Sequence, residues 1–67
     1  MLNIIVNGES KIITESSVLN YILSIPNIEP EHVILEYNEK ILKRLDWEKT
    51  MLKEEDRLEL VRFVGGG

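Results

Sequence analysis

The chain has 67 residues, of which 43% are hydrophobic and 30% charged, and its formal net charge is -4. This composition is typical of a folded domain and too apolar for a disordered chain, and eight basic residues set among twelve acidic ones argue against a nucleic-acid binder. Without cysteine there is no disulfide framework, no thiolate nucleophile and no cysteine zinc site.

The size and the apolar pattern predict one small soluble domain. A chain this short buries only roughly 60% of its unfolded surface on folding, so it has room for one modest core. No apolar run approaches the ~20 residues of a membrane span, and no secretory signal opens the chain, so the cytoplasm is the expected compartment. The acidic surface suits either solubility or a partner with a basic docking face.

The first predicted element is a β-hairpin over residues 2–14. Residues 2–6 are rich in β-branched side chains, and Leu2, Ile4 and Val6 alternate onto one face of a strand. Asn7-Gly8 suits a turn that needs positive φ, and residues 11–14 are predicted as the second strand.

A short helix is predicted next. Val18, Ile22 and Ile25 recur at helical spacing, and Ser17 is the predicted N-cap, whose hydroxyl accepts from a free amide of the first turn. Pro26 and Pro30 then favour a loop.

Residues 33–37 are predicted as the third strand and residues 40–42 as a short fourth strand, joined by a turn at Asn38-Glu39. In residues 45–52, Asp46 is predicted to cap a single helical turn that places Trp47 and Met51 on the same side. Trp47 is expected to be a lid on the core.

The acidic run of residues 54–56 predicts a solvated turn, with the steering of a basic partner as the less favoured reading. Residues 57–64 are predicted as the final strand. Alternation places Leu58, Leu60, Arg62 and Val64 on its core face and Glu59, Val61 and Phe63 on the opposite face.

This order of five strands and one main helix predicts an α+β architecture, a mixed five-stranded sheet curled over the helix in β-grasp order. The terminal strand is expected inside the sheet, beside the first. The predicted domain covers residues 1–64, and Gly65, Gly66 and Gly67 form a flexible C-terminal glycine tail.

The chemistry of such a tail is that of its terminal carboxylate. A free α-carboxyl has a pKa of roughly 3.3 to 3.7, so Gly67 is ionised near neutral pH and its oxygen needs no general base to act as a nucleophile. The chain has no phosphate-binding glycine loop, so ATP must be bound elsewhere. His32 is the only histidine, and a surface or structural role is favoured over a catalytic one.

Several short features, in this order, resemble ThiS-type sulfur carriers of the ubiquitin-like β-grasp superfamily. They are the Asn7-Gly8 hairpin, the Ser17-Val18 helix start, the Asn38 turn, Trp47, the Glu55-Asp56-Arg57-Leu58-Glu59 entry to the last strand, and Phe63-Val64 before the glycines. Glu39 and Glu55 stand where relatives often have Gly, which leaves open a different geometry for these two turns.

The resemblance implies a carrier that is not itself an enzyme, binds no cofactor or metal, and does not act on nucleic acid or membranes. A ThiF-like adenylating enzyme would use ATP to activate Gly67, and a sulfur donor such as a cysteine desulfurase would convert it to a thiocarboxylate. A ThiG-like thiazole synthase, in thiamine biosynthesis, would accept the sulfur. Gly65 and Gly66 would lie in the partner's slot.

Two alternatives stay open from the sequence. One is a carrier of the same chemistry for molybdopterin or a sulfur amino acid, and the other is a ubiquitin-like modifier or interaction module. In each case Val61 and Phe63, beside the tail and opposite the predicted core, are the predicted partner-docking residues, rather than apolar side chains that simply cover the sheet edge.

Overall fold

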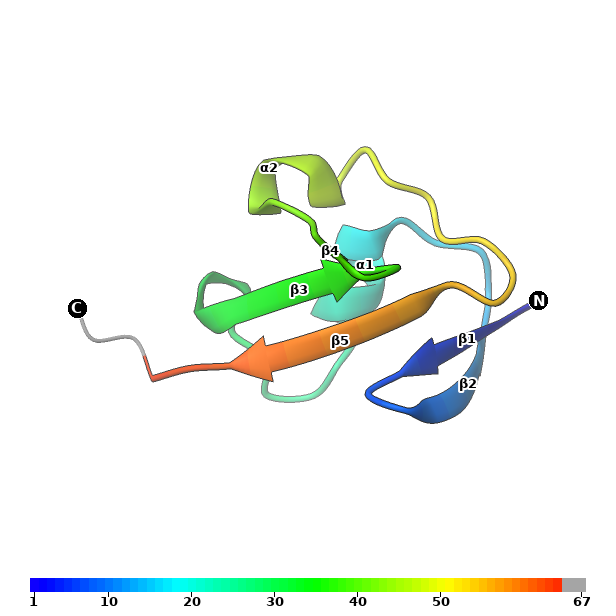
Figure 1. Ribbon diagram of the computed structural model, residues 1–67, viewed down its shortest axis with the longest axis horizontal. Coiled ribbons are helices and arrows are strands. Elements are labelled where there is room, and N and C mark those ends of the chain that lie inside the picture. Colours follow the sequence, from blue (N-terminus) through cyan, green and yellow to red (C-terminus); the bar gives the residue numbers. More distant parts are fainter. Residues whose placement is uncertain (65–67) are drawn as a thin grey trace.

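Five strands form one mixed sheet in the order β2-β1-β5-β3-β4. The strands are β1 (Leu2–Val6), β2 (Glu9–Ile13), β3 (Val33–Tyr37), β4 (Lys40–Ile41) and β5 (Arg57–Arg62), and the helices are α1 (Val18–Leu23), the 3-10 turn η1 (Pro30–His32) and α2 (Arg44–Trp47). The structure, a computed structural model, describes residues 1–64. Figure 1 shows α1 behind the sheet, α2 beyond the β3 edge, and β5 running toward the C-terminal end. The predicted β-grasp architecture is confirmed.

The terminal strand lies inside the sheet, as predicted. β5 pairs in parallel with β1 and antiparallel with β3, so it has a neighbour on each side. Within residues 1–64, no helix has the length and apolar character that crossing a membrane requires.

The first hairpin closes more tightly than predicted. Asn7 and Gly8 adopt φ of 50° and 83°, the left-handed pair that a two-residue turn needs. Pairing therefore resumes at once, with Val6 opposite Glu9, and β2 covers Glu9–Ile13 rather than residues 11–14. The predicted fourth and fifth strands are also slightly too long, because β4 ends at Ile41 and β5 at Arg62, where its last partner is Val33.

The core lies between the sheet and α1. Alternation turns one side of each central strand inward, and α1 adds Val18 and Ile22 at helical spacing. The buried hydrophobic residues are Ile4, Val6, Val18, Ile22, Val33, Leu35, Trp47, Leu52 and Leu58. The predicted N-cap is confirmed, because the Ser17 hydroxyl accepts a hydrogen bond of 3.1 Å from the backbone N–H of Asn20.

Trp47 closes the core beyond the end of the sheet, which confirms the predicted lid. It is 1% exposed, and its indole N–H donates to the Leu42 carbonyl at 2.9 Å. The predicted single helical turn that carries Trp47 is also confirmed, as α2, but the predicted cap is wrong: Lys43, not Asp46, is the N-cap, and it makes no side-chain capping bond. Met51 is 54% exposed and bridges to Ser17, because the chain leaves α2 before a second turn can align Met51 with Trp47.

In two tight turns, a glutamate adopts the left-handed backbone conformation that usually favours glycine. Glu39 has φ of 75° and Glu55 has φ of 67°, both in the left-handed region that side chains with a Cβ disfavour. The sequence left the geometry of these two turns open, and the structure has a left-handed backbone at both glutamates. These two residues carry local backbone strain, which the surrounding contacts retain. Glu39 lies in the turn between the paired strands β3 and β4, and the Glu55 N–H donates to the Asn3 carbonyl.

Replacing Glu55 by glycine is expected to stabilise the domain. Left-handed backbone costs an L-residue about 1–2 kcal/mol, and the extra freedom of glycine in the unfolded chain offsets about 0.4–1 kcal/mol of the relief. Glu55→Gly should therefore raise the free energy of unfolding by up to about 1 kcal/mol in urea denaturation. Glu54→Gly is the matched control with the opposite sign, because its φ is not positive and its carboxylate accepts from the Asn3 N–H. Equal effects from both variants would contradict strain at Glu55.

Candidate partner-docking site at the end of strand β5

The last strand is paired with β3 up to the point where the chain leaves the sheet, whereas its other side is paired only at its start. Along β3 the antiparallel register runs from Tyr37 opposite Leu58 to Val33 opposite Arg62. One further backbone bond follows, in which the Phe63 N–H donates to the His32 carbonyl at 2.9 Å. On the other side β1 pairs with β5 only through Ile5 and Val6.

Asn7 continues this support where β1 ends. Its side-chain oxygen accepts from the Leu60 N–H at 2.7 Å, and its amide donates to the Leu60 carbonyl at a longer 3.5 Å. The sequence predicts only a turn at Asn7 and gives no indication of this contact with Leu60. The one feature of the sequence that could have indicated the contact is the residue type. The side chain of asparagine, unlike that of aspartate or glycine, offers both a donor and an acceptor to a neighbouring backbone.

Val61 lies on the outer face of the sheet, as predicted, because it alternates along β5 with Leu60, which packs against the core. Phe63, the other predicted docking residue, follows directly after the end of β5. Val61 is 54% exposed and stands directly opposite Ile34, which is 46% exposed. Phe63, two residues further, is 43% exposed. We call Ile34, Val61 and Phe63 the outer-face patch. It is an apolar surface beside the last described residues, as a partner surface would require.

Phe63 also has a local packing partner. Its ring centroid lies 5.7 Å from that of His32, whose Nδ1 lies 3.1 Å from a carboxylate oxygen of Glu29. The structural role favoured for His32 therefore has a physical basis, because His32 contacts Phe63, two residues before the predicted tail. This contact covers only part of the Phe63 ring and leaves the rest to solvent.

The predicted tail residues Gly65, Gly66 and Gly67 lie outside the described residues. Val64, the last described residue, is 92% exposed. The Gly67 thiocarboxylate site and the positions of Gly65 and Gly66 in a partner's slot therefore stay predictions.

The acidic run before β5 is not a simple solvated turn. Asp56 is 7% exposed and accepts hydrogen bonds from the Tyr37 hydroxyl at 2.6 Å, the Asn38 amide at 3.1 Å and the Lys53 N–H at 2.8 Å. Burial raises the pKa of Tyr37 to about 12, and both the hydrogen bond to Asp56 and the negative charge of Asp56 act in the same direction. The Tyr37 hydroxyl therefore stays protonated and donates. The solvated-turn prediction is wrong for Asp56, which instead fixes the entry to β5.

Among residues 1–64, no three side chains of the metal-binding types cluster closely enough to hold a metal ion. The structure instead presents an anchored strand, an apolar patch beside its end, and a chain that continues beyond it. This arrangement can deliver a chain terminus to another protein.

A protein-family model described as the ThiS family matches residues 4–67. The chain is 34% identical over 62 residues to the uncharacterized protein ycf40 of Trieres chinensis, covering 92% of this chain and 85% of that protein. It is 32% identical over 66 residues to the thiazole synthase of Magnetococcus marinus, covering 98% of this chain but only 20% of that enzyme. The chain thus spans about a fifth of the length of that relative.

Among solved structures, the fold matches the crystal structure of the thiamine biosynthesis protein ThiS from Geobacter metallireducens. The TM-score is 0.83 at 28% sequence identity, covering 98% of this chain and 100% of that one. The two chains therefore share one arrangement of sheet and helices over nearly their whole length.

Proposed function

The chain belongs to the ThiS family, and from this premise we propose that it carries sulfur as a thiocarboxylate on Gly67 for thiazole formation in thiamine biosynthesis. It is a small carrier protein and not itself a catalyst. The observation that carries the proposal is the family match, which runs from residue 4 through the terminal Gly67.

The proposed chemistry has three steps, which begin at the Gly67 carboxylate. A carboxylate oxygen first attacks the α-phosphate of ATP bound by a ThiF-like adenylating enzyme, which releases pyrophosphate and leaves a mixed anhydride with AMP. The terminal sulfur of a persulfide, such as one on a cysteine desulfurase, then displaces AMP to give an acyl disulfide. A second thiol cleaves the sulfur–sulfur bond, which leaves the thiocarboxylate on Gly67 and a new disulfide on the donor side.

Thiazole synthase is the proposed acceptor of the sulfur. Support comes from the Magnetococcus marinus thiazole synthase, one fifth of which aligns with this chain, and from the name of the Geobacter metallireducens protein with the same fold. In that relative, a domain similar to this chain and a thiazole synthase are parts of one polypeptide. Nothing comparable favours a molybdopterin or amino-acid pathway. We propose a reducing cytoplasm as the compartment, because the chain has no cysteine and so needs no disulfide, and because a reduced thiol is required for the last step above.

Docking of the folded domain must supply most of the binding energy. Ordering three glycines in a slot costs on the order of 3 to 6 kcal/mol, and residues without side chains return little of it. The outer-face patch is the proposed handle, since it places exposed apolar area on the strand that leads into the tail. Because the end of β5 is paired with β3 as far as Arg62, a partner that holds this patch also fixes where the tail starts.

Placing a charge at Phe63 is expected to weaken partner binding. Phe63→Asp would place a carboxylate in the proposed apolar contact, which costs about 1.4 kcal/mol or more, that is, about tenfold or more in the Kd for the adenylating enzyme. Leu45→Asp is the matched control, because Leu45 is 82% exposed and lies on α2, away from the patch. An unchanged Kd for Phe63→Asp, with the fold verified by circular dichroism, would remove Phe63 from the interface.

The proposed pathway is tested by following isotope-labelled sulfur. The chain is incubated with the adenylating enzyme, ATP and a labelled persulfide donor, then separated from the donor and given to thiazole synthase with its other substrates. Label in the thiazole product is expected. A labelled chain that yields only unlabelled thiazole would exclude this acceptor, and higher-mass protein conjugates would instead indicate a modifier.

A further inference from the structure

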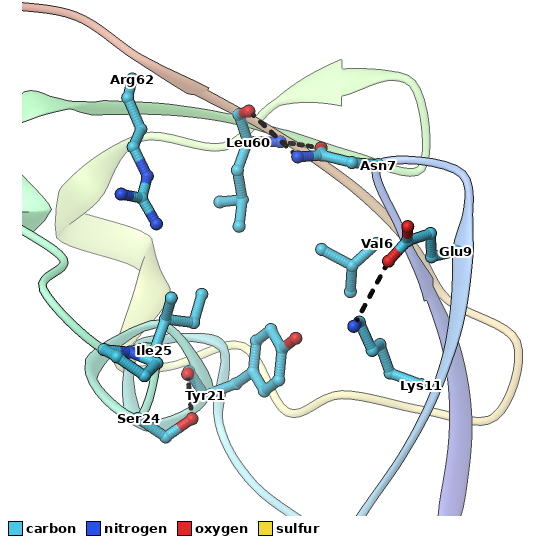
Figure 2. Close-up of a pocket in the computed structure, with 10 residues that line it drawn as sticks. Val6, Asn7, Glu9, Lys11, Tyr21, Ser24, Ile25, Leu60 and Arg62 are labelled. Carbon is cyan, nitrogen blue, oxygen red and sulfur yellow. Dashed lines mark hydrogen bonds and ion pairs between the residues drawn. The ribbon is translucent and has the colours of Figure 1, made fainter.

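A surface hollow of about 510 Å³ lies on the inner side of the sheet, at the end of α1. Its floor is apolar, from Val6 and Leu60 on the sheet and Ile25 after the helix, and Figure 2 shows Arg62, Tyr21 and Lys11 extending toward the same space. The six residues of α1 make a helix about 9 Å long, whereas the six residues of β5 span about 20 Å. The helix therefore ends before it covers the whole strand, and the hollow lies over the uncovered part.

The polar groups around the hollow favour an anion. Arg62 forms no ion pair with any residue of the described chain, and the Tyr21 hydroxyl makes no hydrogen bond there. Lys11 has a carboxylate of Glu9 at 3.4 Å, but both side chains are largely exposed, and such pairs are weak. Two cations against one carboxylate give the hollow a net positive charge in a chain whose formal charge is -4.

We propose that this hollow receives an acidic side chain, flanked by an apolar residue, from the protein that accepts the sulfur, thiazole synthase. The inference rests on the proposed function and adds a second contact to it. The carboxylate would pair with the Arg62 guanidinium, whose planar fork suits bidentate binding, while the apolar neighbour covers Leu60 and Ile25. We call these lining residues the inner hollow.

The position of the inner hollow supports a protein partner rather than a small molecule. Its rim residues are exposed, so a free small ligand would remain largely in water, whereas a binding pocket usually buries most of its ligand. Arg62 alternates along the strand with Val61 and Phe63. One partner could therefore contact the outer-face patch and also insert a carboxylate at Arg62. It would then bind both faces of the same chain segment, just before the tail.

The composite relative points to the same partner. A domain similar to this chain forms one fifth of the Magnetococcus marinus thiazole synthase, so the two units are held near one another there. Even weak contacts form readily at the high effective concentration that such a linkage gives. A separate carrier lacks the linkage, and a charge-assisted contact in the inner hollow would supply part of the missing affinity and much of the specificity.

The test measures the Kd of the full chain for thiazole synthase by calorimetry at low and high salt. Arg62→Glu should weaken binding about tenfold or more and reduce its salt dependence, because attraction becomes repulsion. Ser24→Trp leaves the charge unchanged but fills the inner hollow from its rim, and it should weaken binding to a similar extent. Lys49→Glu is the matched control, an exposed lysine outside the hollow with the same charge change, and should stay within about twofold.

Each outcome bears on the proposal. Equal weakening by Arg62→Glu and Lys49→Glu would show only long-range electrostatics and overturn it, as would Ser24→Trp binding with the affinity of the unmodified chain. Thermal unfolding of each variant verifies that the fold is retained. Sulfur loading by the adenylating enzyme is measured in parallel. If the chain without substitutions is never loaded, the proposed function itself is contradicted. A loaded chain whose variants bind thiazole synthase normally overturns the inner-hollow inference alone.

Discussion

A chain that lacks Gly66 and Gly67 is expected to accept no sulfur, although its domain should fold as before. Two residues of extended chain span about 7 Å, so the new terminal carboxylate would stop well short of the ATP α-phosphate. Because a misplacement of about 1 Å can reduce a rate about a hundredfold, loading should fall below detection rather than merely slow. The buried core residues all lie within residues 4–58, so thermal unfolding should not change.

Deletion of Gly65 alone is the intermediate variant, since it leaves a chain that ends in Val-Gly-Gly and is identical to one that lacks Gly67. It retains a terminal pair of glycines but shortens the chain by one residue, so it should reduce loading less than removal of both terminal glycines. Sulfur loading of the chain without Gly66 and Gly67, seen by mass spectrometry, would contradict the assignment of Gly67 as the reacting group.

Replacing Trp47 by alanine is expected to remove most of the stability of the domain. Trp47 is the largest fully buried side chain, and it also satisfies the Leu42 carbonyl. Truncation of a buried tryptophan typically costs about 3–5 kcal/mol, whereas a domain of this size has only about 3–10 kcal/mol in total. The Arg44 guanidinium, 5.3 Å from the Trp47 ring centroid, would also lose its cation–π contact.

Urea denaturation followed by circular dichroism measures this effect, since the variant has no tryptophan fluorescence. Trp47→Phe should cost less than Trp47→Ala, because the phenyl ring fills much of the space but leaves the Leu42 carbonyl unpaired. Leu45→Ala, on an 82% exposed neighbour, should change the free energy of unfolding by no more than about 0.5 kcal/mol. A similarly small effect of Trp47→Ala would contradict the role of Trp47 as the lid of the core.

Local signals in the sequence predicted the local elements well. Asn7-Gly8 forms the expected left-handed turn, Ser17 caps α1, and the third strand covers the predicted residues 33–37. In these segments the turn residues, the N-cap and the apolar alternation all favour the same structure. Each of these signals acts within one strand, helix or turn and needs no distant residue. The β-grasp order followed because few arrangements bury one face of five strands with one helix.

Long-range contacts were the part that the sequence could not supply. Asp56 lies in an acidic run that was predicted to be a solvated turn. It is instead buried, and it accepts hydrogen bonds from Tyr37 and Asn38, which are 19 and 18 residues away in the sequence. Asn7 reaches Leu60 across 53 residues, and Arg62 faces a hollow only because α1 is short. Asp46 was predicted as the N-cap from its residue type alone, whereas the N-cap is Lys43, three residues earlier, and Trp47 is buried at the end of this helical turn.

The most direct test of sulfur carriage is the mass of the C-terminal peptide after reaction. The full chain is incubated with the adenylating enzyme, ATP, a persulfide donor and a thiol, and its peptides are then fragmented in the mass spectrometer. The expected result is replacement of one oxygen by sulfur, confined to Gly67 and dependent on ATP. An unchanged Gly67 in a chain that demonstrably binds the adenylating enzyme, or sulfur on any other residue, would contradict the proposed carrier function.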